Sequence, residues 1–146
     1  MQEFSFSDLA ISAELFRRKA LCWAEKFNQL AYFDGNEITY LHNGFENLLA
    51  VSGEKTVAIS PEKVFDKLAE VSASGRFWCG LLGYDLKNQV EKLESRHPDL
   101  TGFPEAHFFE PEVLFTFTEK TVAISAEKVA PAEILHQVLA TLIPEI

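Results

Sequence analysis

Histidine is the side chain most often used for metal binding and acid–base chemistry, and this chain of 146 residues has four. A metal site needs several ligands at short, regular intervals, as in zinc-binding motifs. No histidine here has a second ligand at such an interval; the four are His42, His97, His107 and His136. Structural or solvated roles are therefore the better interpretation, and we expect no metal site.

Paired carboxylates are the next candidates, because two of them can serve as general acid and base. Glu91, Glu94 and Asp99 lie close in sequence, but nothing around them indicates a pocket that would shift their pKa values. Tyr84-Asp85 follows a glycine-bearing apolar segment, where Asp85 either caps the next helix or contributes to a site. The sequence has no phosphate-binding glycine loop and no nucleophile elbow. We expect no catalytic residue and no cofactor in this chain.

The composition is typical of a globular protein in the cytoplasm. The net charge of −9 disfavours nucleic acid and anionic membrane surfaces as partners, and the 47% hydrophobic content excludes a disordered chain. Cys22 and Cys79 have apolar neighbours and are expected to be buried free thiols. The start of the chain lacks the pattern of a signal peptide, and no apolar run is long enough to span a bilayer.

Hydrophobic periodicity predicts the elements that would position any site. Four helices are expected. The first spans residues 12–29 with Ser12 as its N-cap, and the second runs from Ser60-Pro61 to about residue 71. The third spans about 85–94, and the fourth begins at Pro131. Strands are expected at 31–33, 48–51, 56–59, 77–82, 113–117 and 121–124. Short connections predict two hairpins, 48–51 with 56–59 and 113–117 with 121–124. This order indicates an α+β fold with a largely antiparallel sheet and packed helices, in one domain over 1–146.

Two details of these elements can be checked in the structure. The helix after Pro61 is expected to bury one face; its members are Val64, Phe65, Leu68 and Val71. Gly80, inside the expected strand 77–82, suggests a bulge or a close approach of another backbone.

One internal repeat is plain. Glu54–Val64 reads EKTVAISPEKV, and Glu119–Val129 reads EKTVAISAEKV. Each copy is expected to lead from a strand toward a helix. Either a unit has been duplicated or one strand-to-helix sequence is used twice, and the unmatched flanks favour the second interpretation.

Three stretches carry a family resemblance. They are FRRKALCWAEKF (16–27) running into YFDGN (32–36), GFENLLAV (44–51), and GLLGYDLKN (80–88) with 91–93 and 103–105. In this order and spacing the chain resembles the N-terminal domain of component I of aminodeoxychorismate synthase, in the anthranilate synthase component I family. Anthranilate synthases usually carry Leu-Leu-Glu-Ser where this chain has Tyr32–Gly35, which favours the first assignment.

The resemblance implies an enzyme that aminates chorismate to 4-amino-4-deoxychorismate, on the way to para-aminobenzoate and folate. Its implied partners are a C-terminal chorismate-binding domain, which would hold Mg²⁺, and a glutamine amidotransferase subunit that supplies ammonia. This chain would then be a structural or regulatory domain without catalysis of its own. The alternatives are the same domain of anthranilate synthase component I and a free-standing, non-catalytic ligand-binding module.

The resemblance also places one wall of a small-molecule site in this domain, which holds tryptophan in feedback-regulated relatives. The candidate ligand-binding residues are Asp34, His42, Asn43 and Phe45. Asp34 would accept from an ammonium group and Phe45 would offer a ring to an indole. The alternative is that Asp34-Gly35 is only turn chemistry. Relatives often have a basic residue where this chain has Gly44.

Five of the thirteen phenylalanines fall between Phe103 and Phe117. Four of them could form an apolar surface exposed by the absence of the C-terminal domain, which would make the isolated chain self-associate. Equally, these rings could fill the core of this domain; the four are Phe108, Phe109, Phe115 and Phe117.

Overall fold

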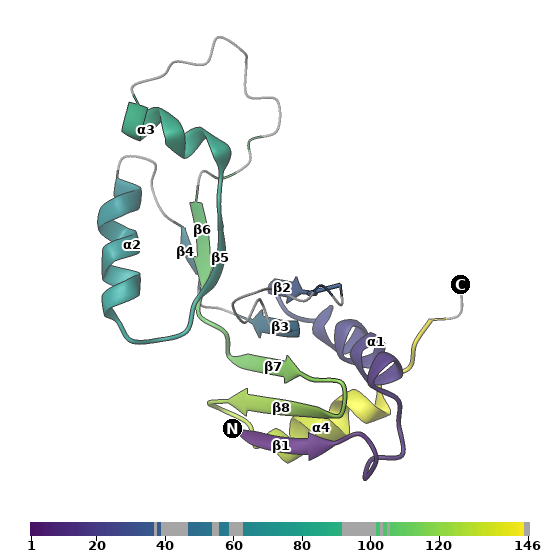
Figure 1. The fold of residues 1–146 in the computed structure, drawn as a ribbon. Coiled ribbons are helices and arrows are strands. Elements are labelled where there is room, and N and C mark those ends of the chain that lie inside the picture. The colour runs from purple at the N-terminus through teal and green to yellow at the C-terminus, as the bar shows by residue number, and fades with distance from the viewer. Residues whose placement is uncertain are drawn as a thin grey trace. The chain divides into compact units, whose positions relative to one another are not determined.

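A computed structural model describes residues 1–36, 38, 47–53, 56–58, 63–91, 102, 104 and 106–144 (Figure 1). The chain forms two compact units. Unit 1 comprises Met1–Glu54 and Pro111–Ile146, and unit 2 comprises Lys55–Glu110. Mixed helices and antiparallel strands confirm the α+β class.

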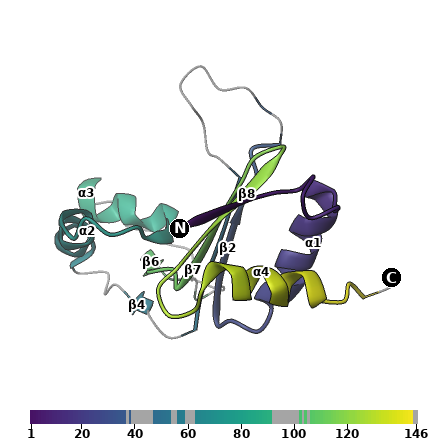
Figure 2. The same ribbon diagram turned by 90° about the horizontal axis from the view of Figure 1, so that it is seen from below.

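Unit 1 is built on a five-stranded antiparallel sheet. Its strands, in sheet order, are β1 (Gln2–Ser5), β8 (Thr121–Ala126), β7 (Val113–Phe117), β3 (Asn47–Ser52) and β2 (Gln29–Phe33). Helices α1 (Ala13–Ala24) and α4 (Pro131–Ala140) both lie on one face of this sheet (Figure 2). The unit is therefore a two-layer arrangement of helices on a sheet.

Helix α1 begins as the sequence predicts. The Ser12 hydroxyl accepts a hydrogen bond from the Leu15 N–H at 3.1 Å, which satisfies one of the free donors of the first turn. The predicted end at residue 29 was wrong, since the helix ends at Ala24. Gln29 instead begins β2, where it pairs with Ser52 of β3.

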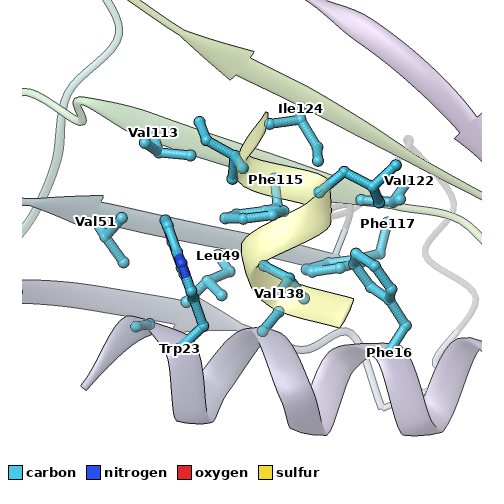
Figure 3. Close-up of a cluster of buried hydrophobic side chains, with 14 of the residues drawn as sticks. Phe16, Trp23, Leu49, Val51, Val113, Phe115, Phe117, Val122, Ile124 and Val138 are labelled. Carbon is cyan, nitrogen blue, oxygen red and sulfur yellow. The ribbon is translucent and has the colours of Figure 1, made fainter. Parts of the chain in front are cut away.

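The core of unit 1 lies between the helices and the sheet (Figure 3). Side chains alternate along β7, so that Val113, Phe115 and Phe117 point to the helices while the two residues between them face the other way. The fully buried members of the cluster from other elements are Phe16, Ala20, Ala24, Leu49, Val51, Val122, Ile124 and Val138.

Helix α1 also stabilises the C-terminal end of α4. The last carbonyls of a helix lack partners within the helix, and α4 has no basic residue in its last turn. The Lys19 ammonium from α1 donates to the Leu139 carbonyl at 2.9 Å and to the Thr141 carbonyl. The charge of Lys19 also complements the negative end of the α4 dipole.

Unit 2 contains a three-stranded antiparallel sheet of β4 (Thr56–Ala58), β6 (Ala106–Phe109) and β5 (Cys79–Leu82), in that order. Its helical elements are α2 (Val64–Ala73), the 3-10 turn η2 (Tyr84–Leu86) and α3 (Lys87–Glu91). A small core joins α2, η2 and β6; it consists of Val64, Leu86 and Ala106, with Leu68 and Phe108 packed against it.

One predicted hairpin was wrong and the other is confirmed. β3 pairs with β2 and β7, whereas β4 belongs to unit 2 and pairs with β6. The hairpin of β7 and β8 is present. Unit 2 thus enters the sequence between two neighbouring antiparallel strands, β3 and β7. Where it leaves and rejoins unit 1, the Glu112 N–H donates to the Val51 carbonyl at 2.9 Å.

The expected buried face of α2 needs one correction. Val64 is fully buried, but Phe65 is 51% exposed. Lys63 is the N-cap residue, while the expected cap Ser60 and Pro61 lie outside the described residues.

The four phenylalanines that could have formed an exposed apolar surface are instead part of the protein core or packed against it. Phe115 and Phe117 belong to the core of unit 1, and Phe108 packs against the core of unit 2. Phe109 is 3% exposed. These four rings therefore do not supply an exposed surface, and self-association stays a prediction without them. Within the described ranges, no helix is both long and apolar enough to cross a bilayer.

Candidate functional site

Asp34 is the only predicted ligand-binding residue in the described part of the chain. His42, Asn43 and Phe45 lie outside the described residues. Asp34 directly follows β2, two positions after Tyr32. Residues two apart on a strand share a face, and Tyr32 packs against the core on the face that α1 covers.

The Asp34 carboxylate is held by local hydrogen bonds. One oxygen accepts from the Asn36 N–H at 2.8 Å, and the other accepts from the Tyr32 hydroxyl at 3.1 Å. Asn36 has a φ of 49°, a conformation that asparagine tolerates better than most residues. The Gly35 N–H donates to the Asn47 side-chain oxygen at 2.7 Å, tying the turn to the start of β3. Asp34 therefore stabilises the turn through its side chain, as the turn interpretation predicts, and the residue remains exposed.

Two charged groups of opposite sign influence the Tyr32 hydroxyl. Burial raises the pKa of Tyr32 most, and the hydrogen bond to Asp34 and its negative charge raise it further. The positive charge of Arg17 acts in the opposite direction. Tyr32 is therefore a neutral hydrogen-bond donor at physiological pH.

Arg17 is the functional candidate that sequence reasoning missed. It extends from α1, with its guanidinium carbon 5.9 Å from the centre of the Phe117 ring. Its Nε is buried and has no hydrogen-bond partner. From the sequence, Arg17 was assigned to the solvent-exposed face of the helix, together with Arg18 and Lys19. The available signal was its position directly after Phe16, which is fully buried.

The surface between α1 and α4 carries a shallow groove. The Trp23 indole N–H and the Lys26 ammonium both donate to the Gln137 side-chain oxygen, at 3.0 and 3.1 Å. The Lys26 nitrogen is also 4.3 Å from the centre of the Trp23 ring, and burial lowers its pKa. These groups satisfy one another, and Gln137 ties the two helices together.

The remaining chemistry-bearing residues are scattered. Among the described residues no three histidine, cysteine or acidic side chains could hold a metal ion together. Cys22 and Cys79 are free thiols, as expected, but only Cys79 is buried; the expected burial of Cys22 was wrong, since this side chain is partly exposed. Burial raises the pKa of Cys79 to about 11. Tyr84 is 82% exposed, with the Lys87 ammonium 4.4 Å from its ring centre. The side chain of Asp85 lies outside the described residues.

The chain was compared with known protein families and with curated proteins, and neither comparison finds a match. A resemblance to any family therefore rests on the three sequence stretches alone.

Proposed function

We propose that this chain is the N-terminal, non-catalytic domain of component I of an aminodeoxychorismate synthase. The order and spacing of the three resembling stretches carry the proposal. The alternatives, the same domain of anthranilate synthase component I and a free-standing ligand-binding module, share its fold class.

The places of these stretches in the structure support the proposal. The first stretch contains most of α1, which supplies Phe16, Ala20 and Trp23 to the core of unit 1. The second contributes most of β3, the strand between β2 and β7. The third forms β5, η2 and the beginning of α3. Each stretch thus belongs to a helix or strand of its unit.

In this proposal the catalytic chemistry takes place outside the chain. A C-terminal domain would bind chorismate and Mg²⁺, and a glutamine amidotransferase subunit would supply ammonia. The described residues of this chain contribute core, strand pairing and one polar corner around Asp34. The residues around Asp34 are proposed as one wall of an amino-acid site, through which the domain would regulate the enzyme. The enzyme would operate in the cytoplasm.

The test combines this chain with its proposed C-terminal half. We expect the pair, with ammonia and Mg²⁺, to convert chorismate to 4-amino-4-deoxychorismate, identified by chromatography and mass. The chain alone should consume no chorismate with ammonia or glutamine. Anthranilate as the product would favour the sister enzyme. If the C-terminal half is equally active without this chain, the free-standing module is favoured.

A further inference from the structure

Two nucleophilic side chains from the C-terminal end of α1 line the same groove. Cys22 belongs to the last turn of α1, and Lys26 follows two residues after the helix ends at Ala24. The groove has a volume of about 620 Å³. The other residues that line it are Trp23, Gln137, Ala140 and Thr141. A thiol and an amine in one groove form a nucleophilic pair that the proposed function does not use.

The Cys22 thiol is the more accessible of the two cysteines. It is partly exposed, whereas Cys79 is 4% exposed. A cysteine sulfur is a strong nucleophile that forms covalent acyl intermediates with activated carbonyl groups. A partly exposed thiol can therefore receive an acyl group directly from a small donor.

The Lys26 amine is held at the groove by its neighbours. Its nitrogen lies 4.3 Å from the centre of the Trp23 ring and donates to the Gln137 side-chain oxygen at 3.1 Å. Burial lowers the pKa of Lys26, which increases the share of uncharged amine at a given pH. Because only the uncharged amine attacks a carbonyl carbon, this environment favours Lys26 as a nucleophile.

We propose that Cys22 and Lys26 form an acyl-transfer site, at which a small acyl thioester modifies Lys26 by way of Cys22. First, the Cys22 sulfur attacks the carbonyl carbon of the donor; a new thioester forms, and the donor leaves as a free thiol. The Lys26 nitrogen then attacks the same carbon and loses a proton. An amide forms, the bond to sulfur breaks, and the Cys22 thiol is regenerated. No atom is oxidised or reduced in either step.

Acylation would also alter the contact between α1 and α4. The amide carries no charge, so Lys26 would lose its cation–π attraction to the Trp23 ring. The Trp23 indole N–H would keep its acceptor, the Gln137 side-chain oxygen at 3.0 Å. The fluorescence of Trp23 should therefore change without unfolding of unit 1. This inference requires neither chorismate nor the amino-acid wall, so it stands or falls independently of the proposed function.

The test uses the 146-residue chain and acetyl coenzyme A as the thioester. Peptide mass spectrometry follows the acetylation of each lysine with time at pH 8. We expect Lys26 to be acetylated roughly tenfold or more faster than Lys120, an exposed lysine of the β7–β8 turn, because transfer from a neighbouring sulfur is intramolecular. Cys22→Ser should slow the acetylation of Lys26 to the rate of Lys120.

Variants then separate the two steps. Lys26→Arg keeps the positive charge but removes the nucleophilic amine, so acetyl groups should accumulate on Cys22 and be removed by excess thiol. The amide on wild-type Lys26 should resist the same treatment. Lys19→Arg is the matched control, because Lys19 lies three residues before Cys22 but donates to the Leu139 and Thr141 carbonyls. This variant should acetylate Lys26 at the wild-type rate, and circular dichroism should show all three variants folded.

An unchanged rate of Lys26 acetylation in Cys22→Ser would overturn the inference, since the amine would then react with the donor directly. A thioester that persists on Cys22 in the wild type would also overturn it, because the amine would not reach the sulfur. Equal rates for Lys26 and Lys120 in the wild type would have the same meaning.

Discussion

The Tyr32 hydroxyl reports the electrostatics of the candidate site. Its pKa is raised above the ordinary value of 10.0, so its neutral form is favoured by folding. The resulting stability is present below pH 10 and is lost as pH rises through the higher pKa of the folded state. In an ultraviolet titration of phenolate, Tyr32 should ionise above pH 10. Subtracting the curve of Tyr32→Phe isolates it from the other two tyrosines.

The same titration separates the two neighbouring charges. Asp34→Asn should lower the pKa of Tyr32, because a negative charge is removed, while Arg17→Gln should raise it. Shifts of the same sign in both variants would show that the two charges do not act on Tyr32 in opposite directions.

The two cysteines should differ sharply in reactivity. With a pKa of about 11, roughly one Cys79 thiol in a thousand is ionised at pH 8, and the side chain is also buried. Cys22 is partly exposed. A disulfide reagent that releases a coloured thiolate should therefore modify Cys22 quickly at pH 8. It should modify Cys79 only as fast as the protein opens and exposes this side chain. Cys22→Ser should remove the fast phase; a fast phase that survives in this variant would contradict the assignment.

The absence of a side chain at Gly80 allows strand β5 to pair with strand β6. A Cβ at this position would lie 2.2 Å from the His107 carbonyl oxygen and 2.5 Å from the Phe108 ring. This is the close approach that the glycine predicted. Gly80→Ala should therefore destabilise unit 2 by about 1–3 kcal/mol through overpacking.

The matched control for that change is Gly53→Ala. There the nearest atom to an added Cβ is a Glu112 carboxylate oxygen at 3.9 Å, which is ordinary contact. Each unit has one tryptophan, Trp23 in unit 1 and Trp78 in unit 2. In a Trp23→Phe background, the fluorescence of Trp78 during urea unfolding reports on unit 2 alone. Equal midpoints for Gly80→Ala and its parent would refute the clash.

For the whole molecule, the path of the chain predicts that unit 1 can fold without unit 2. Val51 and Val113 are already opposite each other in the sheet, so a short turn can replace the inserted residues 55–110. Linking Glu54 to Pro111 through Asn-Gly should leave the five strands and both helices intact. The shortened chain should unfold cooperatively in urea, with Trp23 fluorescence and circular dichroism changing together.

A core substitution provides the control for this experiment. Phe115 is fully buried in unit 1, and Phe115→Ala should cost about 3–5 kcal/mol in the shortened chain and in the full chain alike. A shortened chain with no cooperative transition would mean that unit 1 depends on unit 2 for its stability.

Local signals in the sequence were sufficient for several elements. Ser12 before an apolar stripe predicted where α1 begins, and Pro131 predicted the start of α4. The short connection between β7 and β8 predicted their hairpin. These features depend on residues a few positions apart, whose hydrogen bonds and spacing are encoded together. The same kind of signal located the turn at Asp34, whose carboxylate accepts from Asn36.

Long-range pairing could be decided only by the tertiary structure. The repeated segment EKTVAIS forms a three-residue edge strand, β4, in unit 2, but contributes to the six-residue strand β8 between β1 and β7 in unit 1. Identical residues thus have different partners, because strand pairing is set by the segments that lie alongside. The same reason explains why β3 pairs with β7 instead of β4, and why Arg17 entered the candidate site unpredicted. Its partners Phe117 and Tyr32 come from distant strands, whereas its neighbours in sequence indicate only a solvated helix face.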